Sequence, residues 1–193
     1  MFSRSAGRVE LANAGQPFGA FWEELQSHAV ATVLTAIAGL EAYANELFVD
    51  HPQVFPNIRA DVMGKLWELY EQKATIDKYE FALFLLQASR LDRGANPFQD
   101  VKALIALRNA LVHYKPEWSD EQVEHAKISK LLAGRAAASP FFLTTEPLFP
   151  RAWASHGSTR WAVSSVVAFI QTFETQARLA SRLQPFLQRL TQL

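Results

Sequence analysis

The segment PFQDVKALIALRNALVHYKPEW, residues 97–118, has the pattern of one helix that is stopped at both ends. Asn96 precedes it as a helix cap, and Pro97 stands at the first helical position, where its missing backbone N–H is not needed. Apolar residues dominate the segment until Pro116, which cannot continue a helix. The stretch therefore predicts a helix over residues 97–114.

Glycine and proline divide the rest of the chain into further helical segments. An apolar stripe with three-and-four spacing, from Leu25 to Leu47, predicts a long helix that Pro17 opens and that ends at about Asp50. Weaker patterns predict helices over 57–72, over 75–90 with Thr75 as N-cap, from the capping-box sequence 119–122 to Gly134, and over 158–184 until Pro185. No strand pattern appears, so the sequence predicts an all-α fold: an up-and-down helical bundle with additional short helices.

Length and composition predict one domain. The chain has 193 residues, of which 49% are hydrophobic and 20% are charged, as in ordinary globular proteins. We expect residues 1–16 to form a flexible N-terminal arm and residues 17–193 to form a single helical domain. Residues 135–157 contain three prolines and no clear period, which favours a long loop or an insertion there.

Charge is unevenly distributed along the chain. The formal net charge is zero, but acidic residues exceed basic ones in residues 1–100 and basic residues exceed acidic ones in residues 101–193. A protein that binds polyanions over a wide surface usually carries excess positive charge. Any contact with nucleic acid must therefore be local.

Several classes of site and location are excluded or disfavoured. The chain has no cysteine, which excludes disulfides, thiolate metal sites and cysteine nucleophiles. Its five histidines form no one-turn pair of the kind that binds zinc on a helix, and no phosphate-binding glycine loop is present, so we expect no metal and no cofactor. The apolar stretches 27–40 and 161–173 are too short to span a bilayer, and the N-terminus lacks a signal-peptide core. We expect a cytoplasmic protein without a membrane partner.

Three polar side chains interrupt the predicted central helix. At about 100° per residue, Arg108, Asn109 and His113 share one arc, and Asn109 and His113 are one turn apart. One interpretation is structural, because basic side chains near the C-terminus of a helix interact favourably with its dipole. The other is functional, and it rests on a resemblance.

The heptapeptide RNALVHY resembles the signature of the HEPN superfamily, in which an arginine is followed by a residue that is usually polar, then by a few more residues, and then by a histidine. Here four residues separate Arg108 from His113, and Asn109 is the polar neighbour. The sequence GLEAYANEL, residues 39–47, resembles the earlier long helix of HEPN domains, which often carries a buried acidic or polar residue. The resemblance covers residues 20–180 approximately, and it implies a bundle of HEPN type.

The resemblance implies a metal-independent endoribonuclease with a role in stress or phage defence; the alternative is a non-catalytic nucleotide- or protein-binding module. In the enzyme, the 2′-hydroxyl of RNA attacks the adjacent phosphorus, His113 moves protons, and Arg108 holds the negative charge of the transition state. Asn109 fixes a phosphate oxygen or orients the histidine. Many HEPN proteins are homodimers, so the implied partners are RNA and a second copy, and an antitoxin or operon partner protein is left open.

Glu41 and Asn45, one turn apart on the first long helix, are candidates to support the site. We expect the Glu41 carboxylate to lie within hydrogen-bond reach of Arg108 or His113, in the same chain or in the partner chain, because a half-buried cation needs a counter-charge. The alternative is a surface carboxylate or a structural salt bridge.

Tyr114 and Lys115 complete the set of supporting residues. Tyr114 is a candidate to stack on a base or to donate to a phosphate, and the alternative is a tyrosine that packs at the end of a helix. Some toxin-type HEPN proteins carry a tyrosine two residues after the histidine. Lys115 occupies that place here, so the chain departs from that subgroup.

Overall fold

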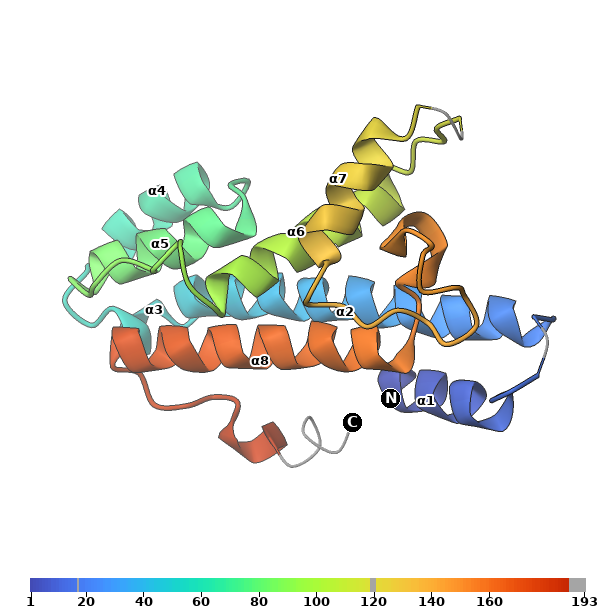
Figure 1. Cartoon of the computed structure of the whole chain (residues 1–193). Helices are drawn as coiled ribbons and strands as arrows, with labels where there is room; N and C mark the ends of the chain where they lie inside the picture. The colour runs from blue at the N-terminus through green and yellow to red at the C-terminus, as the bar shows by residue number, and fades with distance from the viewer. Residues whose placement is uncertain (17, 119–120, 188–193) are drawn as a thin grey trace.

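Figure 1 shows the computed structural model of the chain, which describes residues 1–16, 18–118 and 121–187. Within these ranges the chain forms helices and no strand, which confirms the all-α prediction there. The helices are α1 (Phe2–Ala12), α2 (Phe21–Val49), α3 (His51–Val54), α4 (Ala60–Tyr70), α5 (Thr75–Leu85), α6 (Phe98–Val112), α7 (Val123–Leu132) and α8 (His156–Ala177), with a π-helical turn η1 (Leu148–Ala152) and a 3₁₀ turn η2 (Gln184–Phe186).

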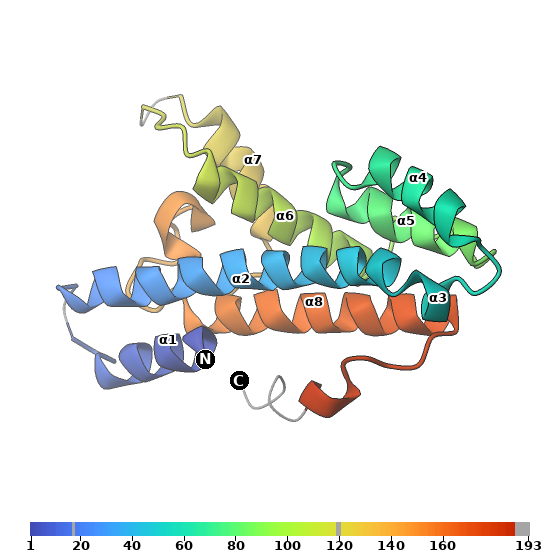
Figure 2. The same cartoon turned by 180° about the vertical axis from the view of Figure 1, so that it is seen from behind.

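The two longest helices, α2 and α8, form the centre of the molecule, where they lie side by side and run in the same direction (Figure 1). The short helix α1 packs antiparallel to α2 at one end of this pair, whereas α6 crosses the pair obliquely on the other side (Figure 2). Helix α6, which lies between α2 and α8 in the sequence, runs in the opposite sense to both of them (Figure 1). None of the helices in the described part of the chain is long and apolar enough to cross a membrane.

The apolar stripe predicted for α2 is confirmed. Leu25, Leu40 and Leu47 are fully buried, and Phe169 and Phe173 of α8 are buried in the same core. Burial of one such side chain contributes about 1.5–3 kcal/mol. The stripe therefore explains why α2 and α8 associate along their length.

A buried polar pair also joins α2 to α8. The Tyr43 hydroxyl donates to a Glu174 carboxylate oxygen at 2.9 Å, and that oxygen also accepts the backbone N–H of Arg182 at 2.7 Å. Burial, followed by the hydrogen bond to Glu174, raises the pKa of Tyr43 well above its usual range. The phenol therefore stays protonated and keeps donating to the carboxylate.

Helix α6 forms as the central segment predicts, with slightly tighter limits. Val101, Leu104 and Leu107 are fully buried, which fixes α6 in the core. Pro97 occupies the N-cap position and no side chain caps the helix there, so Asn96 does not have the predicted role. The helix ends at Val112, before the predicted end at Tyr114.

The prediction of a flexible arm over residues 1–16 was wrong for the helical part of it. Helix α1 packs against α2 and α8, with Ala6 fully buried. The Ser3 hydroxyl is hydrogen-bonded to the Thr159 hydroxyl of α8 at 2.8 Å. The segment has few large apolar residues, so its sequence carries little sign of burial, and the surface that buries it comes from distant helices.

The ends of several helices differ from their predicted positions. α4 is shorter than 57–72 and α5 is shorter than 75–90, and Ala74 rather than Thr75 is the N-cap of α5. α8 ends at Ala177, because Arg178 adopts a left-handed conformation with φ of 54°, and Pro185 lies in η2 instead. The predicted start at Pro17 and the capping serine at 119 lie outside the described residues.

The segment between α7 and α8 is anchored by buried aromatic side chains. Phe149 and Trp153 are fully buried, and the Ser129 hydroxyl of α7 accepts the backbone N–H of Phe149 at 3.0 Å. The predicted long loop over residues 135–157 thus contains the turn η1 and covers one side of α7.

Candidate functional site

The three motif side chains lie at the C-terminal end of α6. Arg108 is half-buried, and its guanidinium donates to the Asn109 amide oxygen at 3.0 Å. His113 is the C-cap residue, with φ of −112° and ψ of 44°, and its side chain is exposed. The backbone N–H of His113 donates to the Asn109 carbonyl oxygen at 2.9 Å, but within the described residues no hydrogen bond joins the two side chains. The motif therefore spans the last helical turn and the residue that ends it.

Arg108 faces a cavity between α2, α5 and α6, which we call the α2–α6 groove. Its volume is about 390 Å³, and its lining includes Glu41, Lys73, Lys102, Arg108 and Asn109. Three of these residues are cationic and one is anionic. Apolar side chains, including Phe98, form another part of the wall. The groove combines positive charge with an apolar surface.

His113 faces a second cavity, which lies between α6 and α7 and which we call the α6–α7 groove. Its volume is about 280 Å³, and it is lined by His113, Lys115, His125 and Phe149, among others. Asn109 lines this groove as well as the first one. The arginine and the histidine of the motif thus belong to different cavities that meet at Asn109.

The segment after α6 is held by α7 through groups that the sequence reasoning missed. The Glu117 carboxylate accepts the backbone N–H groups of Glu124 and His125, each at 2.9 Å, and so caps the first turn of α7. The hydrogen bond from His125 is the main cause that lowers the pKa of Glu117 below its usual value. The helix start that we predicted at 119–122 is thus capped by a residue farther back in the chain, and no local spacing rule signals it.

His125 is the buried centre of this junction. Its Nε2 atom lies 2.9 Å from the Lys115 carbonyl oxygen, and because a carbonyl only accepts, Nε2 must carry the hydrogen. Its Nδ1 atom lies 3.8 Å from a Glu117 carboxylate oxygen. The Tyr114 ring stacks on the imidazole, with ring centres 5.6 Å apart. This contact favours the packing role for Tyr114, although half of its surface stays exposed.

Within the chain, Glu41 does not form the predicted bond to Arg108 or His113. Its carboxylate instead accepts from the Lys78 ammonium at 3.3 Å, and the same ammonium donates to the Asn45 amide oxygen at 2.8 Å. Lys78 is almost completely buried, so its charge needs a carboxylate more than the half-exposed Arg108 does. Glu41 still lines the groove that Arg108 faces, and contact with a partner chain stays a prediction.

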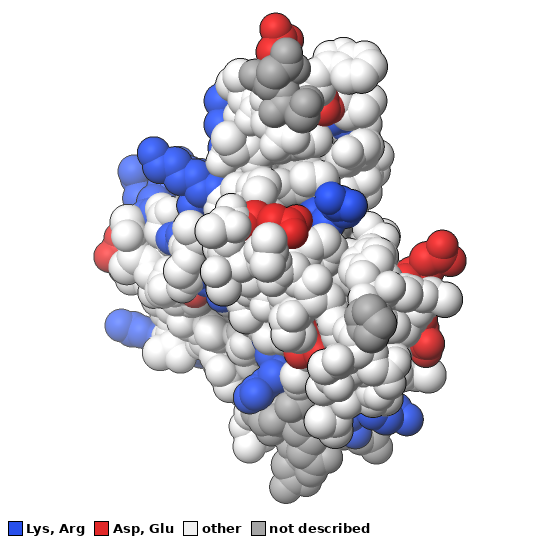
Figure 3. Space-filling model, turned by 45° about the vertical axis from the view of Figure 1, so that its right-hand side comes forward, with Lys and Arg blue, Asp and Glu red and all other residues white. Residues whose placement is uncertain are grey.

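Charged groups elsewhere do not form a continuous binding surface on the face shown in Figure 3, where Lys and Arg side chains lie in separate groups among uncharged residues. In the described ranges, no cluster of three or more His, Asp or Glu side chains is arranged to hold a metal ion.

No model of a known protein family matches the chain, and neither a curated protein nor a solved structure matches it. The helices of the described residues place the chain in the class of all-α proteins.

Proposed function

We propose that this protein is a HEPN-type endoribonuclease that cleaves RNA without a metal ion, through attack of the 2′-hydroxyl on the adjacent phosphorus. One observation carries the proposal: Arg108, Asn109 and His113 lie together at the exposed end of α6, beside two cavities that share Asn109. The HEPN type of the bundle belongs to the same proposal.

The chemistry follows from what each group is free to do. The imidazole of His113 is exposed and accepts no hydrogen bond within the described residues, so it can take a proton from a 2′-hydroxyl or give one to the leaving oxygen. The Arg108 guanidinium donates to a neutral amide oxygen, which leaves its charge for a phosphate. Asn109, which faces both grooves, would bind a phosphate oxygen between them.

A homodimer is part of the proposal. Apolar side chains surround the end of α6 and remain exposed: Val112, Tyr114, Trp118 and Val123. A patch of this kind is typical of an interaction surface, and a twofold axis needs only one such self-complementary patch. A second copy docked there would bring two Arg108 and two His113 side chains into one cleft, which compensates for the separation of the two grooves within a chain.

Two observations favour the alternative, a non-catalytic nucleotide- or protein-binding module. Arg108 and His113 face different cavities, so a single chain does not present them to one phosphate. The zero net charge also provides no general attraction for RNA. In a binding module, the α2–α6 groove would act without His113.

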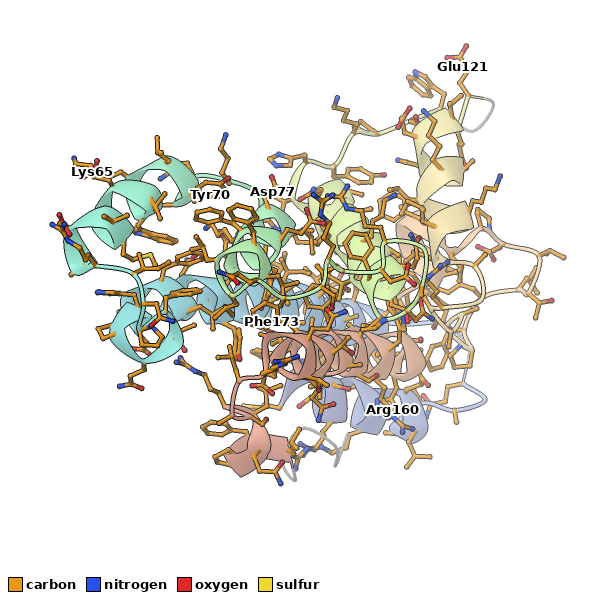
Figure 4. The ribbon with its side chains drawn as sticks, turned by 90° about the vertical axis from the view of Figure 1, so that its left-hand side faces the viewer. Lys65, Tyr70, Asp77, Glu121, Arg160 and Phe173 are labelled. Atoms are coloured by element: carbon orange, nitrogen blue, oxygen red, sulfur yellow. The ribbon has the colours of Figure 1, made fainter. Side chains whose placement is uncertain are left out.

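The test is incubation of the purified protein with total RNA in the presence of EDTA. We expect cleavage that leaves 2′,3′-cyclic phosphate ends, and we expect His113→Ala and Arg108→Ala to remove most of it while circular dichroism stays helical. Matched controls are His51→Ala in α3 and Arg160→Ala in α8. Figure 4 shows Arg160 beside α1 and far from Asp77 of α5, the helix that borders the α2–α6 groove. Loss of cleavage in EDTA would reject the mechanism.

The role in stress or phage defence is tested in growing bacteria. Expression of the wild-type chain should arrest growth, and expression of His113→Ala should not. If growth stops with both, the effect does not come from cleavage. If co-expression of an adjacent operon gene relieves the arrest, that gene encodes the antitoxin or operon partner.

A further inference from the structure

The carboxylate of Glu41 pairs with the Lys78 ammonium and lines the same cavity as Arg108. Glu41 lines the α2–α6 groove together with Arg108, yet its hydrogen bond is with Lys78. Arg108 has only the neutral Asn109 oxygen as a hydrogen-bond acceptor within the described residues. Elsewhere in the chain, Arg59, Arg93, Arg135 and Arg182 each pair with a carboxylate. The outcome of this competition decides the charge of the groove.

The burial of Lys78 explains why it holds Glu41. The Lys78 side chain is 2% exposed, so water cannot solvate its ammonium, whereas the Glu41 side chain is 45% exposed. A buried ammonium without a counter-charge is unfavourable, and the pairing energy of a carboxylate is therefore greater at Lys78 than at the partly hydrated Arg108. Asn45 supplies a second acceptor, and the Trp67 ring lies 5.6 Å from the ammonium.

We propose that Lys78 is a positioning residue: by holding Glu41, it keeps Arg108 and the adjacent Lys73 and Lys102 available to bind a backbone phosphate of the substrate strand. This inference rests on the proposed function. Without the Lys78 contact, the Glu41 carboxylate is the anionic group in the groove lining that can neutralise Arg108. With the contact, three cationic side chains face the cavity and the one carboxylate among its lining residues is already paired.

The groove suits a phosphodiester of a nucleic-acid strand better than a free inorganic anion. The guanidinium offers paired N–H donors to phosphate oxygens, and the two ammonium groups add charge around them. Phe98, Ile76 and Ile105 line the same cavity and provide an apolar surface for the sugar and base that adjoin the phosphate. The subsite would hold a phosphate next to the one that is cleaved.

The first experiment measures binding. The probe is a fluorescein-labelled single-stranded RNA 12-mer in EDTA, and His113→Ala is present in every variant to prevent cleavage. Lys78→Met should weaken binding on the order of tenfold, the effect of losing one charge-assisted phosphate contact, and adding Glu41→Gln should restore it. Lys65→Met, in an exposed ion pair with Glu68 on α4, is the matched control and should change little. If Glu41→Gln does not restore binding, Lys78 acts in some other way and the inference fails.

The second experiment does not depend on RNA. Glu41→Gln and Arg108→Gln are combined in a double-mutant cycle, read as shifts in the urea midpoint, in the Lys78 and Lys78→Met backgrounds. The shifts should add when Lys78 is present and should fail to add when it is absent, because only then does Glu41 pair with Arg108. Additive shifts in both backgrounds would overturn the inference.

A third measurement covers the case in which Lys78→Met does not fold. With Lys78 retained, Arg108→Gln should lower RNA affinity by the same factor in the wild-type and Glu41→Gln backgrounds, because Glu41 is not hydrogen-bonded to Arg108 in the native chain. A loss that differs between the two backgrounds would show that Glu41 competes for Arg108 and would contradict the inference. If the wild-type chain binds no RNA, the proposed function fails, and the urea cycle still tests Lys78.

Discussion

The Nε2 atom of His125 donates a 2.9 Å hydrogen bond to the carbonyl oxygen of Lys115, and this bond fastens α7 to the chain just beyond the motif histidine. The backbone N–H of His113 donates to the Asn109 carbonyl oxygen at 2.9 Å, but its imidazole has no hydrogen bond in the described part of the molecule, so the side chain is positioned by the backbone on both sides of it. The buried imidazole of His125 is therefore a structural support for the end of α6.

Replacement of His125 by phenylalanine should separate this hydrogen bond from ring packing. The new ring keeps the contacts with Tyr114 and Phe149, but the Lys115 carbonyl loses its donor. We expect a loss of unfolding free energy of about 1–2 kcal/mol, measured by urea denaturation. His51→Phe, at a histidine on the other side of the molecule, is the control, and equal losses in both variants would show that the bond has no particular importance.

The cap of α7 should make stability depend on pH. The pKa of Glu117 is lowered in the folded chain, so its charge stabilises the fold above the ordinary glutamate pKa, about 4.3, and this contribution is lost as pH falls through the lower folded-state pKa. We expect wild type to be more stable than Glu117→Gln at pH 7. Urea unfolding between pH 3 and pH 7 should show that the difference in unfolding free energy between wild type and Glu117→Gln decreases as pH falls. A difference that does not vary with pH would show that the charge of Glu117 does not stabilise α7.

The docking of α1 should be sensitive to the size of one residue. A Cβ atom at Gly7 would lie 2.8 Å from the His156 ring, so α1 approaches α8 as closely as it does because this residue is glycine. We expect Gly7→Val to destabilise the chain by about 1–3 kcal/mol through overpacking. Gly39→Ala in α2 is the matched control: its Cβ meets nothing within 4 Å, and the substitution should stabilise by about 0.5–1 kcal/mol. Thermal unfolding of both variants gives the comparison.

The dimer should depend on the apolar residues at the end of α6. Trp118 is 82% exposed, and Trp118→Asp should convert a dimer into a monomer in sedimentation equilibrium at micromolar concentration and should also reduce cleavage. The control is Leu69→Asp on α4, which is also exposed and distant from the motif. A wild-type chain that sediments as a monomer, or a dimer unaffected by Trp118→Asp, would remove the composite cleft and favour the binding module.

Local patterns were sufficient for much of the fold. The three-and-four spacing of apolar residues in α2 and the proline that precedes α6 identify both helices, because a helix brings residues three and four apart onto one face whatever surrounds it. The motif at the end of α6 could likewise be found from the sequence, since Arg108, Asn109 and His113 lie within six consecutive residues. The two grooves beside it could not be predicted, because they form only where α5 and α7 approach α6.

Only the tertiary structure decided which charged side chains pair with one another. The sequence analysis predicted that Glu41 contacts Arg108 or His113, in the same chain or in a partner chain. Within the chain, Glu41 instead pairs with Lys78, which is 37 positions away. The burial of α1 was also decided by the tertiary structure, because its small residues are buried only where α2 and α8 pack against them. Periodicity is a property of one segment, and it determines the helices. The pairing of a carboxylate depends on which cation has lost its water, and that loss occurs only when distant helices pack together.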